Sequence, residues 1–191
     1  MSASRRVFVA LELPGELRQR LVDLPKLVGT PDAKIRWVNL KQMHLTLFFA
    51  GEADDQQVEA LREAVKTAGE LYGALRIKVG ELGAFPKRSN PRVIWVGIGE
   101  NEELKRIQSS IAEAGQRAGL PAEERSFSPH LTLGRVKFVE RHSPLLKRLQ
   151  SVKVESFFYV FDTLTLFESK LTPDGPEHRA LESVRLTSGL Q

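Results

Sequence analysis

The tetrapeptide His-Leu-Thr-Leu occurs twice in this chain, at residues 44–47 and again at residues 130–133. In an extended strand successive side chains point to opposite faces, so histidine and threonine share one face of each copy and the leucines take the other. Each copy therefore predicts a strand with a buried leucine face and a polar histidine face. If two such strands face each other across a cleft, two imidazoles and two hydroxyls converge on one point, an arrangement suited to holding and cleaving a phosphodiester.

The composition is typical of a soluble globular protein. The chain has 191 residues, of which 41% are hydrophobic and 27% charged, and no apolar run approaches the ~20 residues of a membrane-spanning helix. Because it contains no cysteine, disulfides, thiol nucleophiles and thiolate metal sites are excluded, and we expect a cytoplasmic protein. The basic start runs into a short apolar stretch that predicts a first strand, not a signal peptide. The net charge of +4 favours an anionic partner.

Apolar periodicity predicts an alternation of strands and amphipathic helices. We expect strands at residues 7–13, 35–38, 44–51, 75–79, 93–98, 130–133, 154–160, 163–167 and 180–186. Helices are expected at residues 15–24, 55–72 and 101–118, with a short one from Ser143. The two rounds of strand, helix and strand predict one bilobal domain over residues 1–191. Its fold class would be α+β, a duplicated fold with two antiparallel sheets facing a central cleft and helices on the outside.

Paired histidines suit concerted acid and base catalysis. Imidazole titrates near pH 6.5, so one ring can donate a proton while its partner accepts one. Phosphoryl transfer needs two proton events, one at the attacking oxygen and one at the leaving oxygen. Thr46 and Thr132, on the same faces as His44 and His130, are placed to hydrogen-bond the non-bridging oxygens.

Other kinds of catalytic site fit the sequence less well. Zinc normally takes three or four clustered His, Cys or carboxylate ligands, and neither tetrapeptide has a second strong ligand beside its histidine. The chain has no Gly-x-Ser-x-Gly elbow, no Walker-type loop and no Gly-x-Gly-x-x-Gly. The remaining chemistry is acid and base catalysis without metal or cofactor.

Two further residues are candidates for the site. Arg135 follows the second tetrapeptide and could neutralise a phosphate, but strict alternation would place it on the face opposite His130. Its use therefore requires a bulge at Gly134 that turns it back. Phe48 would share the face of His44 and could stack on a base, although a role in the apolar core is an equal alternative.

The remaining histidines and a basic turn are expected at the surface. His142 and His178 lie in polar surroundings. Lys87 and Arg88 occupy the turn of an expected hairpin and Arg92 follows it, where they could collect RNA phosphates or be ordinary surface cations.

These residues resemble the two-histidine phosphoesterase superfamily, whose signature is a pair of His-x-Thr-x motifs. Within it the chain is similar to the RNA 2′,3′-cyclic phosphodiesterases, also called LigT-like proteins or 2′-5′ RNA ligases. The likeness covers most of residues 5–136. It includes Arg-Val-Phe-Val-Ala-Leu at 6–11, Ile-Arg-Trp-Val at 35–38, Phe-Ala-Gly-Glu at 49–52, Pro-Arg-Val-Ile-Trp-Val-Gly at 91–97 and Phe-Ser-Pro-His-Leu-Thr-Leu-Gly-Arg at 127–135. Family members often have Phe-Leu-Gly where this chain has Phe-Ala-Gly at 49–51.

The resemblance implies hydrolysis of a terminal 2′,3′-cyclic phosphate of RNA to a 2′-phosphomonoester, without metal. It implies that His44 donates a proton to the departing 3′ oxygen and that His130 accepts the proton of the attacking water. Thr46, Thr132 and Arg135 would bind the phosphate. The same site could also run in reverse and join RNA ends through a 2′-5′ bond. Two alternatives stay open: a module that binds RNA or nucleotides without turnover, and a cyclic phosphodiesterase of small nucleotides. No membrane and no obligate protein partner is implied.

Overall fold

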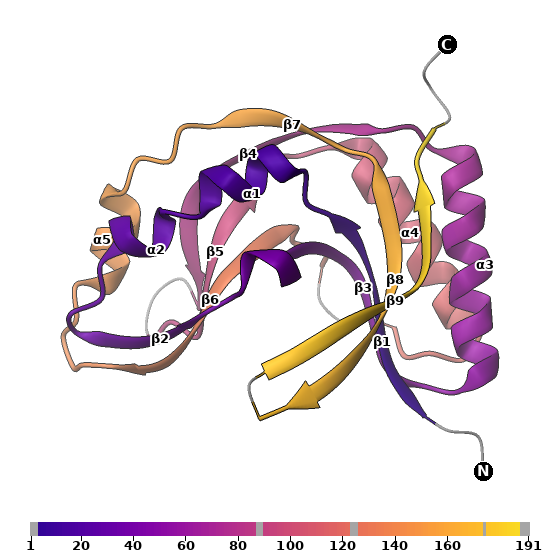
Figure 1. Ribbon diagram of the computed structural model, residues 1–191, viewed down its shortest axis with the longest axis horizontal. Coiled ribbons are helices and arrows are strands. Elements are labelled where there is room, and N and C mark those ends of the chain that lie inside the picture. Colours follow the sequence, from indigo (N-terminus) through magenta and orange to yellow (C-terminus); the bar gives the residue numbers. More distant parts are fainter. Residues whose placement is uncertain (1–3, 87–89, 123–125, 174, 188–191) are drawn as a thin grey trace.

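Two antiparallel sheets each hold one copy of the repeated tetrapeptide (Figure 1). The computed structural model describes residues 4–86, 90–122, 126–173 and 175–187. The four-stranded sheet has the order β3 (His44–Ala53), β1 (Arg5–Glu12), β8 (Thr163–Thr172), β9 (Gly175–Arg185). The five-stranded sheet has the order β2 (Ala33–Trp37), β6 (His130–Val139), β5 (Val93–Ile98), β4 (Leu75–Phe85), β7 (Phe157–Phe161). The predicted fold class is confirmed.

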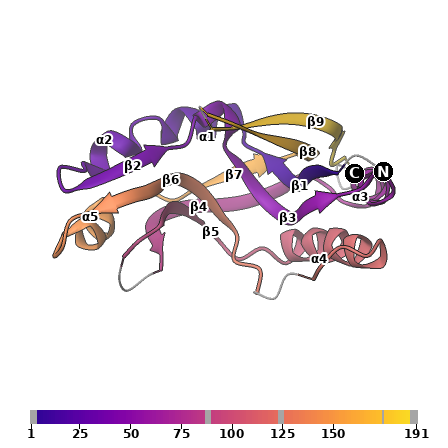
Figure 2. The same cartoon turned by 90° about the horizontal axis from the view of Figure 1, so that it is seen from below.

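The helices lie on the outer side of the sheets, away from the polar faces of the two tetrapeptides. The helices are α1 (Gly15–Leu21), α2 (Leu24–Val28), α3 (Asp55–Leu71), α4 (Glu102–Arg117) and α5 (Leu145–Ser151), with a short 3₁₀ helix at Leu40–Gln42. Helices α3 and α4 pack side by side against the four-stranded sheet, and α1, α2 and α5 accompany the five-stranded one (Figures 1 and 2). None of the described helices is long and apolar enough to cross a bilayer.

Local signals account for where the two long helices begin. The Asp54 carboxylate accepts a hydrogen bond from the backbone N–H of Gln57, and the Gln57 side chain accepts one from the backbone of Asp54. The Asn101 side chain accepts a hydrogen bond from the backbone N–H of Leu104. Such caps satisfy backbone donors that have no partner inside the helix. The helix predicted at 15–24 is broken into α1 and α2, the second beginning beside Pro25.

The leucine faces of both tetrapeptides form the core. Leu45 and Leu131 are fully buried, and so are Leu11 of β1 and Ile94 of β5. Strands β3 and β6 are where the two sheets come together (Figure 2). The histidine faces therefore line the space between the sheets, and the leucine faces anchor them from behind.

Each tetrapeptide ends in a β-bulge at its second leucine. Strand β3 has one extra residue, Leu47, opposite the step from Val9 to Ala10 of β1. Strand β6 has one extra residue, Leu133, opposite the step from Ile94 to Trp95 of β5. A bulge reverses the alternation of side chains beyond it. The bulge needed to re-aim Arg135 is thus present, and a matching bulge in β3 had not been expected.

Strands β8 and β9 continue well beyond the predicted segments. The sequence predicts strands only at 163–167 and 180–186, whereas the hairpin runs to Thr172 and resumes at Gly175. Its outer half has mixed polar side chains without a buried face, so apolar periodicity does not mark it. In Figure 1 this yellow hairpin projects well past the rest of its sheet.

Candidate active site

A cleft of about 410 Å³ lies between the two sheets, and residues of both tetrapeptides line it. His44 and Thr46 come from β3, and Thr132 and Arg135 come from β6. The cleft also receives further residues from β2 and β6, from the segment before β3 and from the β8–β9 hairpin. These are Arg36, Trp37, Val38, Asn39, Gln42, Met43, Lys137, Thr172, Gly175, Pro176, Glu177 and His178.

The His44 ring is enclosed by other rings. Its centroid lies 4.6 Å from that of Phe8, 5.3 Å from that of His178 and 6.0 Å from that of Phe167. Burial lowers the pKa of His44 to about 4, and the neighbouring His178 acts in the same direction, while the Gln42 carbonyl acts against them. At neutral pH in the free protein, His44 is therefore an uncharged imidazole.

Both histidines are held by the same backbone contact. The Nδ1 of His44 lies 2.8 Å from the carbonyl oxygen of Gln42, and the Nδ1 of His130 lies 2.8 Å from the carbonyl oxygen of Ser128. A carbonyl oxygen only accepts hydrogen bonds, so each Nδ1 carries a hydrogen and donates it. In the neutral ring, Nε2 is then left as the proton acceptor, and in the charged ring it is the proton donor.

His130 stands beside the cleft and is less enclosed than His44. It begins β6, two residues before Thr132 and on the same face. Its ring meets the edge of Phe85 at 5.2 Å between centroids, and it is not among the residues that line the 410 Å³ cleft. The structure therefore brings His44, Thr46, Thr132 and Arg135 together in one cavity, with His130 next along the strand.

Cationic side chains form one wall of the cleft. Beyond the bulge, Arg135 is exposed and lines the cleft, directly across the β2–β6 pair from Arg36, which also lines it. Lys137 is a third cation of this wall. Three cations around one concave surface attract an anion and can hold it with charge-assisted hydrogen bonds. Arg36 and Lys137 were not singled out by the sequence, because isolated cations in strands are usually surface residues.

The β8–β9 hairpin closes the cleft from the side of the four-stranded sheet. Gly175 has a φ of +126°, and a Cβ on it would overlap the guanidinium of Arg36. The hairpin backbone therefore packs directly on a residue of the other sheet, and the positive φ at this position favours glycine. Glu177 and His178 of the same hairpin face into the cleft.

His178 was predicted to be a surface residue, and this prediction was wrong. The ring is only partly exposed and lies 4.9 Å from the Phe8 centroid and 5.3 Å from the His44 centroid. Burial lowers the pKa of His178. The error arose because the polar residues around it in sequence lie in an outlying hairpin that folds back over the cleft. His142, in contrast, is exposed as expected.

The prediction that Phe48 presents its ring on the face of His44 was also wrong. The bulge at Leu47 turns Phe48 into the core, where it is 3% exposed and packs on Gly115 of α4, 2.7 Å from where a Cβ would stand. Its place as the exposed residue after the bulge is taken by Phe49, whose ring centroid lies 5.1 Å from the Arg6 guanidinium carbon. The core alternative for Phe48 is thus the one the structure shows.

The basic turn contributes nothing that can be assigned to the site. Lys87 and Arg88 lie outside the described residues, and Arg92 is exposed. The described part of the chain also contains no group of three or more His, Asp or Glu side chains that could hold a metal ion.

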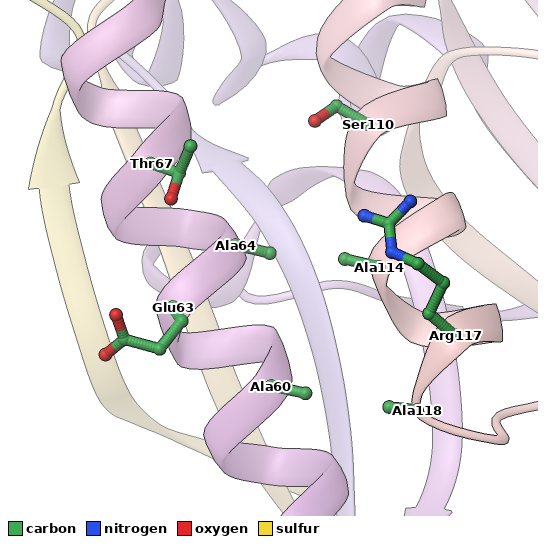
Figure 3. Close-up of a pocket in the computed structure, with 8 residues that line it drawn as sticks. All are labelled: Ala60, Glu63, Ala64, Thr67, Ser110, Ala114, Arg117 and Ala118. Atoms are coloured by element: carbon green, nitrogen blue, oxygen red, sulfur yellow. The ribbon is translucent and has the colours of Figure 1, made fainter.

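A second hollow, of about 390 Å³, lies between α3 and α4 and has a different character (Figure 3). Small side chains of the two helices face each other there, and Glu63 points away from the groove (Figure 3). Glu63 instead pairs with Lys66 of its own helix at 2.8 Å. The groove is lined by Ala60, Glu63, Ala64, Thr67, Ser110, Ala114, Arg117 and Ala118. It holds no pair of groups suited to proton transfer, so the cleft between the sheets is the candidate active site.

Comparison with known proteins gives matches over nearly the whole chain. The sequence model of the 2′-5′ RNA ligase superfamily matches residues 16–170. A relative named RNA 2′,3′-cyclic phosphodiesterase from Archaeoglobus fulgidus is 31% identical over 92% of this chain and 97% of its own. One of the same name from Thermotoga maritima is 27% identical over 97% of both chains.

Solved structures show the same fold. Protein TT0787 of Thermus thermophilus superposes with a TM-score of 0.83 at 26% identity, covering 96% of this chain and 99% of its own. LigT of Escherichia coli, solved in complex with 3′-AMP, superposes with a TM-score of 0.77 at 22% identity, covering 97% and 100%.

Proposed function

Because the chain belongs to the 2′-5′ RNA ligase superfamily, we propose that it hydrolyses 2′,3′-cyclic phosphate ends of RNA to 2′-phosphomonoesters. The observation that carries this proposal is the convergence of His44, Thr46, Thr132 and Arg135 in one cleft lined by both sheets. The names of the relatives support the substrate. Both lobes are needed in this proposal, because one sheet supplies His44 and Thr46 and the other supplies Thr132 and Arg135.

His130 is the base in the proposed reaction. Its Nδ1 donates to the Ser128 carbonyl, so the lone pair of Nε2 is available to take a proton from water. The water oxygen forms a bond to phosphorus as that proton leaves. The backbone contact fixes the ring orientation before substrate arrives, which reduces the ordering needed in the reaction.

His44 is the acid, and it must gain a proton before it can act. In the free protein its pKa is about 4, mainly because of burial. An anion placed beside an imidazole favours the charged form, so the bound phosphate raises the pKa of His44. The Nε2 hydrogen then passes to the 3′ oxygen as the bond between phosphorus and that oxygen breaks, leaving the phosphate on the 2′ oxygen.

The hydroxyls and cations hold the phosphate. Thr46 and Thr132 donate hydrogen bonds to the two non-bridging oxygens, one from each lobe, and Arg135 neutralises the charge that grows on them. Arg36 and Lys137 extend the positive field of the same wall. With a 5′-hydroxyl in place of water, the same groups can join two RNA ends: His130 takes the hydroxyl proton as O5′ bonds to phosphorus, and His44 protonates the departing 3′ oxygen, which leaves a 2′-5′ bond.

The test uses an RNA oligonucleotide with a 2′,3′-cyclic phosphate end, incubated with the protein in EDTA and followed by phosphorus NMR. A 2′-phosphomonoester is the expected product, and a 3′-phosphomonoester would overturn the assignment of the leaving oxygen. Binding of the oligonucleotide without any turnover would favour a binding module. Turnover of a cyclic mononucleotide but not of an oligonucleotide would favour a phosphodiesterase of small nucleotides. An RNA substrate and a chain without cysteine are also consistent with a cytoplasmic location.

A further inference from the structure

The face of the five-stranded sheet that carries His130 continues beyond it to an exposed aromatic ring. Residues directly opposite in an antiparallel pair share a face. His130 pairs with Gly97 of β5, and Gly97 pairs with Gly80 of β4. Lys78 lies two residues before Gly80, on the same face, and pairs with Phe158 of β7. His130 and Phe158 therefore lie on one face of the sheet, three strands apart.

This face is open, whereas the opposite face is the core. Val96, Leu131 and Val79 on the opposite face are 0–3% exposed. On the face of His130, Phe158 is 54% exposed, and Arg76 and Lys78 are exposed as well. Val160, which pairs with Arg76 on the same face, is 55% exposed, so Phe158 and Val160 form a small contiguous apolar patch beside two cations, and such patches mark contact surfaces.

Phe158 and two cations form a compact unit, which we call the Phe158 platform: Arg76, Lys78 and Phe158. The guanidinium carbon of Arg76 lies 4.3 Å from the Phe158 ring centroid. Among the described residues neither Arg76 nor Lys78 takes part in an ion pair. The platform thus combines an aromatic face with two cations whose charge is not neutralised by a carboxylate partner.

The surface between His130 and the platform carries two side chains close to its glycines, Trp95 beside Gly97 and the small Ser156 over the buried Gly80. Gly97 and Gly80 form it, and a Cβ on Gly97 would stand 2.9 Å from the Gly80 carbonyl oxygen and 3.4 Å from the Trp95 ring. Ser156 packs on Gly80, with its Cα 2.9 Å from where a Cβ would be. The path along this face of the sheet from His130 to the platform therefore runs beside the Trp95 ring and over Ser156.

The chemistry of the platform fits single-stranded RNA. Cations attract successive phosphates, and bases stack on aromatic rings and on guanidinium groups. From the spacing of strands and of residues along them, Phe158 lies about 16 Å from His130. A nucleotide held at His130 does not span that distance, whereas the nucleotides that precede the end of an RNA chain do.

We propose that the Phe158 platform binds the nucleotides that precede the reacting 3′ end of an RNA substrate. A base stacks on Phe158, and Lys78 and Arg76 contact the phosphates beside it. The inference rests on the proposed hydrolysis of cyclic phosphate ends. It adds a preference for oligonucleotides over cyclic mononucleotides. Glu81, whose Cβ lies 3.9 Å from the position of a Gly97 Cβ, adds a negative charge beside the path and weakens this binding.

The test compares kcat/KM for a cyclic mononucleotide with that for an oligonucleotide of about eight residues bearing the same cyclic end. Phe158→Ala should lower the value for the oligonucleotide at least about fivefold, as expected for the loss of one stacked base, and leave that for the mononucleotide unchanged. Lys78→Glu should do the same, with a weaker dependence on salt than the wild type. Glu81→Gln should raise the value for the oligonucleotide alone.

Matched controls separate the platform from general surface effects. Phe138→Ala removes a ring that is 59% exposed on another part of β6, and Lys66→Glu makes the same charge change on α3. Neither control variant should change kcat/KM for the mononucleotide or for the oligonucleotide. The inference fails if the platform variants leave kcat/KM for the oligonucleotide unchanged. It also fails if they lower kcat/KM equally for the oligonucleotide and the mononucleotide.

A binding measurement keeps the inference testable if the wild type turns over neither substrate, an outcome that would contradict the proposed function itself. Fluorescence anisotropy of a labelled oligonucleotide reports binding without turnover. Weaker binding by Phe158→Ala and Lys78→Glu, but not by the controls, would support the platform. Equal binding by all variants would overturn it.

Discussion

The two copies of His-Leu-Thr-Leu have the same local structure and different surroundings. Both histidines begin a strand, and both donate Nδ1–H to the carbonyl two residues before them, at 2.8 Å. Both copies have a bulge at the second leucine. Yet His44 lies among Phe8, Phe167 and His178, whereas the ring contact of His130 is the edge of Phe85.

The repeated sequence therefore determines the local geometry of each histidine, while the segments packed around His44 determine its charge. The three rings beside His44 come from β1, β8 and β9, which have no sequence relation to the tetrapeptide. Their burial of the ring lowers the pKa of His44 to about 4. Two identical motifs can in this way take two different steps of one proton-transfer reaction.

The two motifs also differ in the residues that follow their bulges. Phe48 enters the core after the first bulge, while Gly134 after the second lies against Trp37, 2.8 Å from where a Cβ would stand. The next residue is exposed in both copies, Phe49 in the first and Arg135 in the second. At this position, therefore, only the second copy brings a cation to the cleft.

Removing either ring should have the largest effect. His44→Asn and His130→Asn retain a donor for the carbonyl oxygen but cannot exchange protons, so each should lower kcat at least ~100-fold, as for the loss of one general acid or base. The measurement is turnover of an RNA with a cyclic phosphate end, with thermal unfolding as a check that both variants fold. Near wild-type turnover by either variant would remove that histidine from the reaction.

The next largest difference should be between substitutions at the exposed positions after the two bulges, Arg135 and Phe49. Arg135→Ala should lower kcat/KM roughly 30-fold, since a charge-assisted hydrogen bond contributes about 2 kcal/mol. Phe49→Ala, at the matching position of the first copy, should change it less than about twofold. Steady-state kinetics with a cyclic mononucleotide measures both values of kcat/KM. Equal losses of kcat/KM in the two variants would mean that the two positions do not differ in function.

The free energy of unfolding should depend on pH because burial lowers the pKa of His44. Its pKa is about 4 in the folded protein and near 6.5 unfolded, so the unfolded chain binds the proton more readily. The contribution is complete above pH 6.5 and is lost as the pH falls toward 4. Relative to His44→Asn, the wild type should lose about 2 kcal/mol of unfolding free energy between pH 7.5 and pH 5. Urea denaturation at both pH values measures this, and parallel curves for the two proteins would contradict it.

The smallest loss of kcat should come from removing the threonine hydroxyls, and it should be equal for the two motifs. Thr46→Val and Thr132→Val each remove one hydroxyl donor at little change in shape, and each should lower kcat about 10-fold. Because both hydroxyls occupy the same place in their motifs, the two losses should agree. A loss confined to one variant, in single-turnover measurements, would show that the phosphate is held by one lobe.

Much of this arrangement could be predicted from the sequence. Alternation in the tetrapeptides predicted the strands, their buried leucines and the shared face of histidine and threonine, because the pattern of a strand is local in sequence. The use of Arg135 in the site required a bulge at Gly134, and the structure has this bulge one residue earlier, at Leu133. The match of helices 55–72 and 101–118 indicated the duplication, because capping and apolar stripes are also local signals.

The rest depended on contacts between distant segments. The aromatic enclosure of His44 arises from strands β1, β8 and β9, and the pairing of β2 with β6 is what places Arg36 in the cleft. His178 was misjudged because its hairpin has little apolar periodicity, and its ring contacts are with residues distant in sequence, Phe8, His44 and Phe167. Phe48 was misplaced because no glycine adjoins the bulge at Leu47, whereas Gly134 adjoins the one at Leu133.

We infer that the surroundings of His44 keep its ring neutral until phosphate binds. NMR titration of the histidine rings, assigned with the single variants, measures this directly. We expect His44 to titrate near pH 4 in the free protein and to move upward by at least about one unit with saturating inorganic phosphate. A His44 ring that titrates near pH 6.5 and does not respond to phosphate would contradict the account.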